Sequence, residues 1–182
     1  LLDTPPEPHP ALECLFTVSE ETGLEGAHAF DPAAAGATAT RMINLDSENE
    51  GVLTAGCSGG VRTDITVPVN AERREGVTVT VTLSGFSGGH SGVEIHEGHT
   101  NAIKALGRIL CNLSTRYDFA LIAISGGGKD NAIPRDATAT LLVGNAADAE
   151  RLCADARAEA EFLRAEPNVI AVDKNFVCTA EG

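Results

Sequence analysis

The chain has 182 residues, of which 43% are hydrophobic, enough for one well-packed core or two smaller ones in a globular protein. Its 26 acidic and 13 basic residues give a formal net charge of −13, and no basic run is longer than Arg73-Arg74. This balance argues against binding to nucleic-acid phosphates. No apolar run approaches the length of a membrane span, so we expect neither nucleic acid nor membrane among the partners.

The five cysteines are scattered along the chain and form no C-x-x-C pair. An odd number at such spacings argues against a disulfide framework and against a thiolate zinc site. The pattern is typical of a reducing compartment, and we therefore expect a cytoplasmic protein with no signal peptide at its start.

Two short apolar runs in the first third of the chain each end on acidic residues. The run over 11–18 predicts a buried strand and is followed by Glu20 and Glu21, whereas the run over 41–45 ends on Asp46. Ligand sites of open α/β sheets lie at the carboxyl ends of strands, and carboxylates are good cation ligands. The pattern therefore favours a cation site built from these acids.

The periodicity changes after a glycine-rich stretch near residue 60, where we place a domain boundary. Beyond it the sequence predicts strands over 61–70, 77–83, 119–124 and 137–143, helices over 100–114 and from a cap at Asn145 to Pro167, and a last strand within 169–177. The core order β-α-β-β-α-β is that of a ferredoxin-like sandwich. We expect an α+β protein with one domain over 1–60 and another over 61–182.

The most distinctive segment is Gly85–Leu110, which reads GFSGGHSGVEIHEGHTNAIKALGRIL. A strand, a glycine-rich turn and a helix present His90 on backbone that a ligand can approach closely, with N–H groups free to donate. An ordinary glycine-rich turn with one exposed histidine is an equally good interpretation of this segment alone.

Other interpretations stay open at this point. The two glutamates at 20 and 21 also suit the acidic first turn of a helix over 20–29, where the helix dipole favours anions. His90, His96 and His99 could form a metal site, although their spacing matches no compact ligand pattern. Cys57 could pair with a histidine as a nucleophile, although a buried cysteine that only packs is more frequent.

Five motifs occur in order along nearly the whole chain. They are FTVSEETGLEGA (16–27), INLDSENEG (43–51), GCSGG (56–60), GGHSGVEIH (88–96) and NAIPRDA (131–137). Together they resemble the middle of the aminoacyl-histidine dipeptidases, bacterial carnosinase-like members of the co-catalytic zinc peptidase group. The resemblance implies an α/β catalytic domain with two metal ions and a smaller lid domain inserted in it. Residues 1–60 would then be part of the catalytic domain and 61–182 an incomplete lid and dimerisation domain.

The resemblance also implies roles for individual residues. These are the general base Glu20, the metal ligands Glu21 and Asp46, and the substrate contacts His90, Asn131 and Arg135. A water between two divalent ions becomes acidic, and a carboxylate that binds no metal can take its proton. The fork of an arginine suits the terminal carboxylate of a dipeptide.

The same resemblance sets expectations for cofactors and partners. It implies two divalent metal ions, with zinc as the first choice and cobalt or manganese as alternatives. It also implies a dipeptide substrate of the Xaa-His type and a homodimer formed through the lid. The upstream His-x-Asp motif of the family and its downstream histidine are absent from this sequence, and one protein ligand per metal is too few. We therefore expect an internal fragment that is inactive alone. The alternative is a non-catalytic lid, dimerisation or peptide-binding module.

Overall fold

The computed structural model describes residues 8–46, 50–56, 59, 61 and 63–182. The chain forms two compact units, Leu1–Gly59 and Gly60–Gly182. The predicted boundary near residue 60 lies next to this division, while the roles predicted for the two parts stay predictions.

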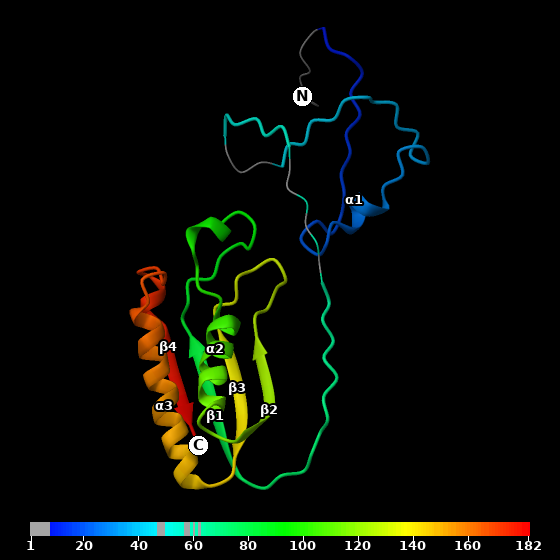
Figure 1. The fold of residues 1–182 in the computed structure, drawn as a ribbon. Helices are drawn as coiled ribbons and strands as arrows, with labels where there is room; N and C mark the ends of the chain where they lie inside the picture. The colour runs from blue at the N-terminus through cyan, green and yellow to red at the C-terminus, as the bar shows by residue number, and fades with distance from the viewer. Residues whose placement is uncertain (1–7, 47–49, 57–58, 60, 62) are drawn as a thin grey trace. The chain divides into compact units, whose positions relative to one another are not determined.

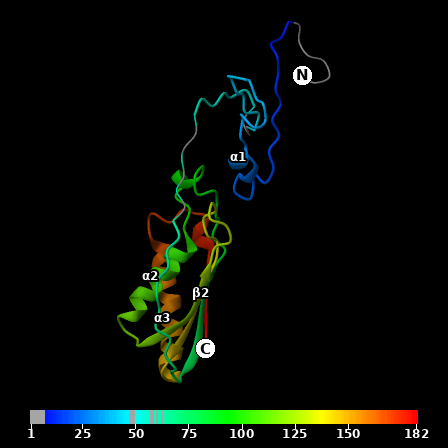
Figure 2. The ribbon, with the colours of Figure 1, turned by 90° about the vertical axis from the view of Figure 1, so that its right-hand side faces the viewer.

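The second unit is a four-stranded antiparallel sheet with two helices on one face (Figures 1 and 2). The strands are β1 (Val77–Ser84), β2 (Phe119–Gly126), β3 (Ala137–Val143) and β4 (Val177–Glu181), and the helices are α2 (Ala102–Ser114) and α3 (Ala146–Ala165). Two short 3-10 turns, η1 (Ile95–Glu97) and η2 (Asp173–Asn175), complete it. The sheet order β2-β3-β1-β4 and the order of elements along the chain confirm the predicted ferredoxin-like sandwich and the α+β class.

Strand β1 shows why this unit folds as the sequence predicts. Its Val-Thr alternation directs Val79, Val81 and Leu83 to the helix-covered face, where all three are fully buried. β1 pairs with β3 on one side and with β4 on the other, so its backbone groups have partners along both edges. On the opposite face the hydroxyls of Thr82 and Thr138 lie 3.1 Å apart. One strand therefore supplies the centre of both the sheet and the core.

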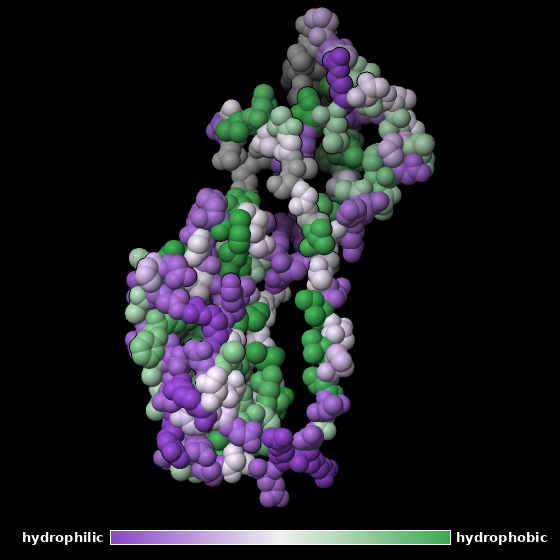
Figure 3. Space-filling model, in the orientation of Figure 1, coloured by the Kyte–Doolittle hydropathy of each residue, from purple (hydrophilic) through white to green (hydrophobic). Residues whose placement is uncertain are grey.

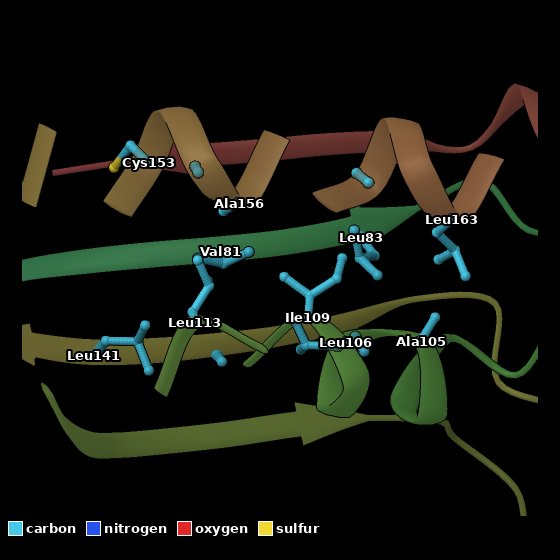
Figure 4. Packing of buried hydrophobic residues seen from close by; sticks show 14 of the residues in the cluster. Val81, Leu83, Ala105, Leu106, Ile109, Leu113, Leu141, Cys153, Ala156 and Leu163 are labelled. Atoms are coloured by element: carbon cyan, nitrogen blue, oxygen red, sulfur yellow. The ribbon is translucent and has the colours of Figure 1, made fainter. Parts of the chain in front are cut away.

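The helices are held by caps at their starts and by apolar faces against the sheet. Asn101 accepts a hydrogen bond from the Lys104 N–H at 3.0 Å, and Asn145 accepts one from the Asp148 N–H at 2.9 Å. Side chains from both helices and from the strands meet in one core (Figure 4), whose members include Val81, Leu83, Leu106, Ile109, Leu113, Leu141, Ala156 and Leu163.

The first unit contradicts most of the local predictions made for it. Residues 11–18 and 41–45 form no strand, and the predicted helix over 20–29 is reduced to α1 (Glu25–Ala29). Phe16 and Ile43 are each 83% exposed, because the described part of this unit contains no neighbouring strand to pair with these segments or to cover them. The sheet predicted for this part of the chain is therefore wrong for this structure.

Two predictions in the second unit also fail locally. Residues 63–70 are extended but belong to no ladder, and Val69 is 84% exposed. The last strand begins only at Val177, after the η2 turn, so most of the segment predicted within 169–177 is not a strand. In the described part of the chain no helix is both long and apolar enough to cross a membrane.

Candidate functional site

Two loops at one end of the sheet continue the β1–β3 ladder beyond the strands (Figure 1). We call residues 86–100 and 127–136 the loop pair. His90 and Ala132 form an antiparallel bridge, the Ser91 N–H donates to the Asn131 carbonyl at 2.9 Å, and the Ile133 N–H donates to the Gly89 carbonyl at 2.8 Å. The segments that carry His90, Asn131 and Arg135, far apart in sequence, are therefore brought together in this loop pair.

Arg135 links the two halves of the loop pair through both backbone and side chain. The Phe86 N–H donates to the Arg135 carbonyl at 3.3 Å, and Nε of Arg135 donates to the Phe86 carbonyl at 3.1 Å. The arginine stem crosses Gly88, where a Cβ would lie only 2.5 Å from Arg135 Cγ, and Gly88 has a φ of +71°. Glycine is therefore required at position 88, both for the backbone angle and for the room it leaves to Arg135.

The orientation of the His90 ring is set by its own turn. Nδ1 accepts the N–H groups of Gly92 at 3.0 Å and Val93 at 3.1 Å, and the carboxylate of Glu94 accepts the His90 N–H at 2.5 Å. Because Nδ1 is an acceptor, the proton of the neutral ring lies on Nε2. The side chain is exposed, so His90 can present an N–H donor to a ligand.

A second polar network closes the base of the same loop. The Ser87 hydroxyl lies 2.5 Å from Nδ1 of His99, and Nε2 of His99 lies 3.0 Å from the Glu97 carboxylate. The Asp173 carboxylate, fully buried, accepts the N–H groups of Ser87 at 2.7 Å and Thr100 at 2.6 Å. Burial by itself would raise the pKa of Asp173, but the hydrogen bonds from Ser87 and Thr100 outweigh it and lower that pKa.

Sequence reasoning missed Asp173. It lies in a short polar stretch with no capping pattern or helical period that would indicate a buried carboxylate. It also lies outside every motif that carried the family resemblance. A buried acid of this kind becomes visible only when the fold brings its partners to it.

The ligand atoms of Glu94, Glu97 and His99 lie within 4.8 Å of one another. Among the described residues, these three form the group whose side chains have the chemistry of a cation site. Each already has a partner in the loop, since Glu94 accepts the His90 N–H while Glu97 and His99 bond to each other. The three residues are therefore explained as part of the loop scaffold. Neither His90 nor His96 belongs to this group, so the three-histidine site considered from the sequence is not formed.

The three acids predicted for catalysis and metal binding lie in the first unit and are exposed. The Glu20 carbonyl accepts the N–H groups of Gly23 at 3.2 Å and Leu24 at 3.1 Å, which places Glu20 and Glu21 in a turn before α1. The Asp46 N–H donates to the Asn44 side chain at 2.9 Å. The carboxylates of Glu21 and Asp46 have the right donor chemistry for a divalent ion, but in the described part of the chain neither belongs to a group of three ligands. Cys57, the alternative nucleophile, lies outside the described residues.

Known proteins resemble this chain in both sequence and fold. Residues 81–167 match the family described as "Peptidase dimerisation domain". Over 140 residues the chain is 44% identical to the cytosol non-specific dipeptidase of Escherichia coli (strain K12), covering 74% of this chain and 28% of that protein. The resemblance to dipeptidases is confirmed.

A solved structure agrees with this result. The aminoacylhistidine dipeptidase of Vibrio alginolyticus superposes with a TM-score of 0.53 and 32% identity, covering 60% of this chain and 23% of that one. This chain therefore spans about a quarter of the length of the dipeptidases it resembles.

Proposed function

We propose that this chain is part of a metal-dependent dipeptidase that hydrolyses Xaa-His dipeptides, with residues 1–60 contributing to the catalytic domain and 61–182 to the lid. The observation that carries the proposal is the loop pair, which joins the segments of His90, Asn131 and Arg135 by backbone hydrogen bonds. The two relatives support a dipeptide substrate, since both are named as dipeptidases. Only one of the two names specifies histidine, so Xaa-His selectivity is the narrower part of the proposal.

The acids of the first unit would carry the proton transfers. Glu20 takes a proton from the attacking water and passes it to the amine nitrogen that leaves when the peptide bond breaks. Glu21 and Asp46 each contribute a carboxylate oxygen to one of two divalent ions, zinc in the first place, and the further ligands come from outside the described residues. When bound, such ions would make a coordinated water more acidic.

The loop pair would bind the rest of the substrate. The Nε2–H of His90 donates to the carbonyl oxygen, which becomes more negative as water adds, and the tautomer fixed by Gly92 and Val93 suits this role. The exposed Arg135 would bind the terminal carboxylate through its fork, and the Asn131 side chain would add a polar contact.

The test is hydrolysis of an Xaa-His dipeptide by the full-length protein, with metal content measured in every sample. We expect Glu20→Gln to lower kcat by roughly 10²-fold or more while bound metal is unchanged. Glu25→Gln, an exposed acid in the neighbouring helix α1, is the matched control and should leave kcat unchanged. A full-length protein that binds no metal and cleaves no dipeptide rules this function out.

We propose a second function, homodimerisation through the lid, because the exposed edge strand β2 favours it. The sheet ends in β2 on one side and in β4 on the other. β2 has eight residues with neither charge nor proline, and Leu121, Ile122 and Ile124 are 53%, 55% and 49% exposed. Hydrophobic atoms are visible over this edge (Figure 3). An unprotected apolar edge strand is a surface for pairing with another chain, and β4, with five residues and Glu181, is less suited.

Two lysine substitutions distinguish the edges. Ile122→Lys on β2 and Val177→Lys on β4 change side chains of similar exposure, 55% and 53%. In sedimentation equilibrium we expect the unsubstituted protein and Val177→Lys to be dimers and Ile122→Lys to be mainly monomer. A dimer lost only in Val177→Lys would assign the interface to β4, and a monomeric unsubstituted protein would exclude this function.

We also propose a cytoplasmic location. The free thiols of Cys14, Cys111, Cys153 and Cys178 suit a reducing compartment. The name of the Escherichia coli relative places that protein in the cytosol. Fractionation of cells that produce the full-length protein tests the location, and activity in a secreted fraction would contradict it.

A further inference from the structure

Asp173 lies at the point where the two ends of the His90 loop, residues 87–100, come together. Its Oδ1 accepts the Ser87 N–H at 2.7 Å and its Oδ2 accepts the Thr100 N–H at 2.6 Å. Ser87 precedes the glycine-rich turn and Thr100 precedes α2, so one carboxylate bridges the entry and the exit of the loop. The Ser87 hydroxyl and Nδ1 of His99, 2.5 Å apart, join the same two ends.

The segment that carries Asp173 is itself fixed to α3 and, through the pairing of Val177 with Ser84, to the sheet. The rings of Phe86 and Phe176 are stacked with centroids 4.6 Å apart. The Arg164 guanidinium lies 4.7 Å above the Phe176 ring and donates to the Phe176 carbonyl at 2.8 Å. The carboxylate is therefore held in a rigid setting, and the loop ends are positioned relative to it.

We propose that Asp173 is a positioning residue for His90. By holding the N–H groups of Ser87 and Thr100 it fixes the base of the loop, and thereby the place from which Nε2 of His90 meets the substrate. The inference rests on the function proposed above for His90. Asp173 lies beyond residues 81–167, the segment that matches the dimerisation family.

The geometry requires a carboxylate rather than any polar side chain. Each carboxylate oxygen accepts a different N–H group, so both oxygens must be acceptors. Asn has nearly the same shape but only one acceptor oxygen, so Asp173→Asn leaves one of the two N–H groups facing an amide NH₂ group. A buried donor without an acceptor is costly, and the loop end that carries it is held less firmly, by the Ser87–His99 contact without the carboxylate.

The first experiment is a double-mutant cycle in the full-length enzyme with an Xaa-His dipeptide. We expect Asp173→Asn to lower kcat by about tenfold or more, with a smaller change in KM, because misplacing a catalytic group by about 1 Å can cost up to about 10²-fold. His90→Ala should lower kcat further, and the double variant should be no slower than His90→Ala alone, since Asp173 acts through His90. Losses that add independently in the double variant would overturn the inference.

The second experiment measures amide hydrogen exchange in the same proteins. In Asp173→Asn we expect the Ser87, Thr100, Gly92 and Val93 amides to exchange about tenfold faster or more, while amides of β1 and β3 keep their protection. Asp155→Asn is the control, because Asp155 pairs with Arg116 at 2.9 Å and lies on α3, away from the loop. It should change neither the loop amides nor kcat.

The two proposals fail in different ways. An inactive full-length protein, or an active one in which His90→Ala has no effect, removes the proposed function, and the exchange data still decide whether Asp173 holds the loop. Unchanged loop exchange in Asp173→Asn overturns the inference even if the enzyme is active. If Asp173→Asn does not fold, Asp173→Glu replaces it in both experiments, because it keeps the charge and shifts the carboxylate by one methylene. A Glu variant with unchanged loop exchange and kcat overturns the inference equally.

Discussion

Similar apolar runs adopt different structures in the two units of this chain. In Gly60–Gly182 the alternating β1 lies between two strands, and its Val79 and Val81 are fully buried. In Leu1–Gly59 the runs around Phe16 and Ile43 stay exposed and form no strand. An apolar run becomes a strand only where a neighbour pairs with its backbone and another layer covers its side chains. The comparison shows that hydrophobic pattern alone does not determine structure.

The largest expected difference between the units concerns single leucines. Leu106 is fully buried in α2, so Leu106→Ala should lower the free energy of unfolding by about 3 kcal/mol, through lost burial and a residual cavity. Leu45 is 82% exposed, and Leu45→Ala should change it by less than about 0.5 kcal/mol. Urea denaturation of the 182-residue chain measures both. Equal effects would mean that the first unit has a core of its own.

The next effect is that of the buried carboxylate, and it depends on pH. The pKa of Asp173 is lowered by folding, so the ionised group stabilises the fold above its unfolded value of about 3.9, and this contribution is lost as pH falls through the lower folded pKa. At pH 7 we expect Asp173→Asn to cost about 2 kcal/mol. The gap to the unsubstituted chain should shrink as pH falls below about 4. A gap that widens on acidification would reverse the assigned sign.

A smaller effect compares two glycines with similar backbone angles. Gly88 has a φ of +71° and is crowded by Arg135, whereas Gly36 has a φ of +68° with nothing within 4 Å of an added Cβ. Gly88→Ala should destabilise the second unit by about 1–2 kcal/mol and displace Arg135. Gly36→Ala has only the backbone strain and should leave the unfolding midpoint of the second unit unchanged. Thermal unfolding followed by circular dichroism tests the pair.

The smallest expected effect is that of a helix cap. The Asn145 side chain accepts the Asp148 N–H at 2.9 Å at the start of α3, and Asn145→Ala should cost about 1 kcal/mol. In the first unit Leu24 occupies the N-cap position before α1, with a φ of 59° and no capping hydrogen bond from its side chain. Leu24→Ala should therefore remove no cap and should leave the unfolding of the second unit unchanged. Denaturation curves that shift equally for both variants would contradict this difference.

The fold of the second unit was predictable because its signals are local. The period of two over 77–83, the cap at Asn145 and Pro167 each determine an element without reference to the rest of the chain. The strand predicted over 11–18 from the same kind of pattern does not form, because a strand needs a partner strand and the local pattern does not indicate one. Local rules predict an element, and its neighbours decide whether it forms.

The candidate site was predictable only in part. The motifs around His90 and Arg135 singled out both residues, but their pairing follows from the adjacency of β1 and β3 in the sheet. Asp173 gave no sequence signal, because its burial results from contacts with residues more than 70 positions away in sequence. The roles of Glu20, Glu21 and Asp46 stay predictions.

The continuation of the β1–β3 ladder into the loop pair has a mechanical consequence. Hydrogen bonds at Phe86, Gly89 and Ser91 join the His90 side to the Asn131 and Arg135 side, so the two sides cannot separate without breaking several bonds together. The predicted substrate contacts would then move together as one rigid unit rather than independently of one another. The spacing of their backbones is set when the sheet folds, and a movement of one side would carry the other side with it.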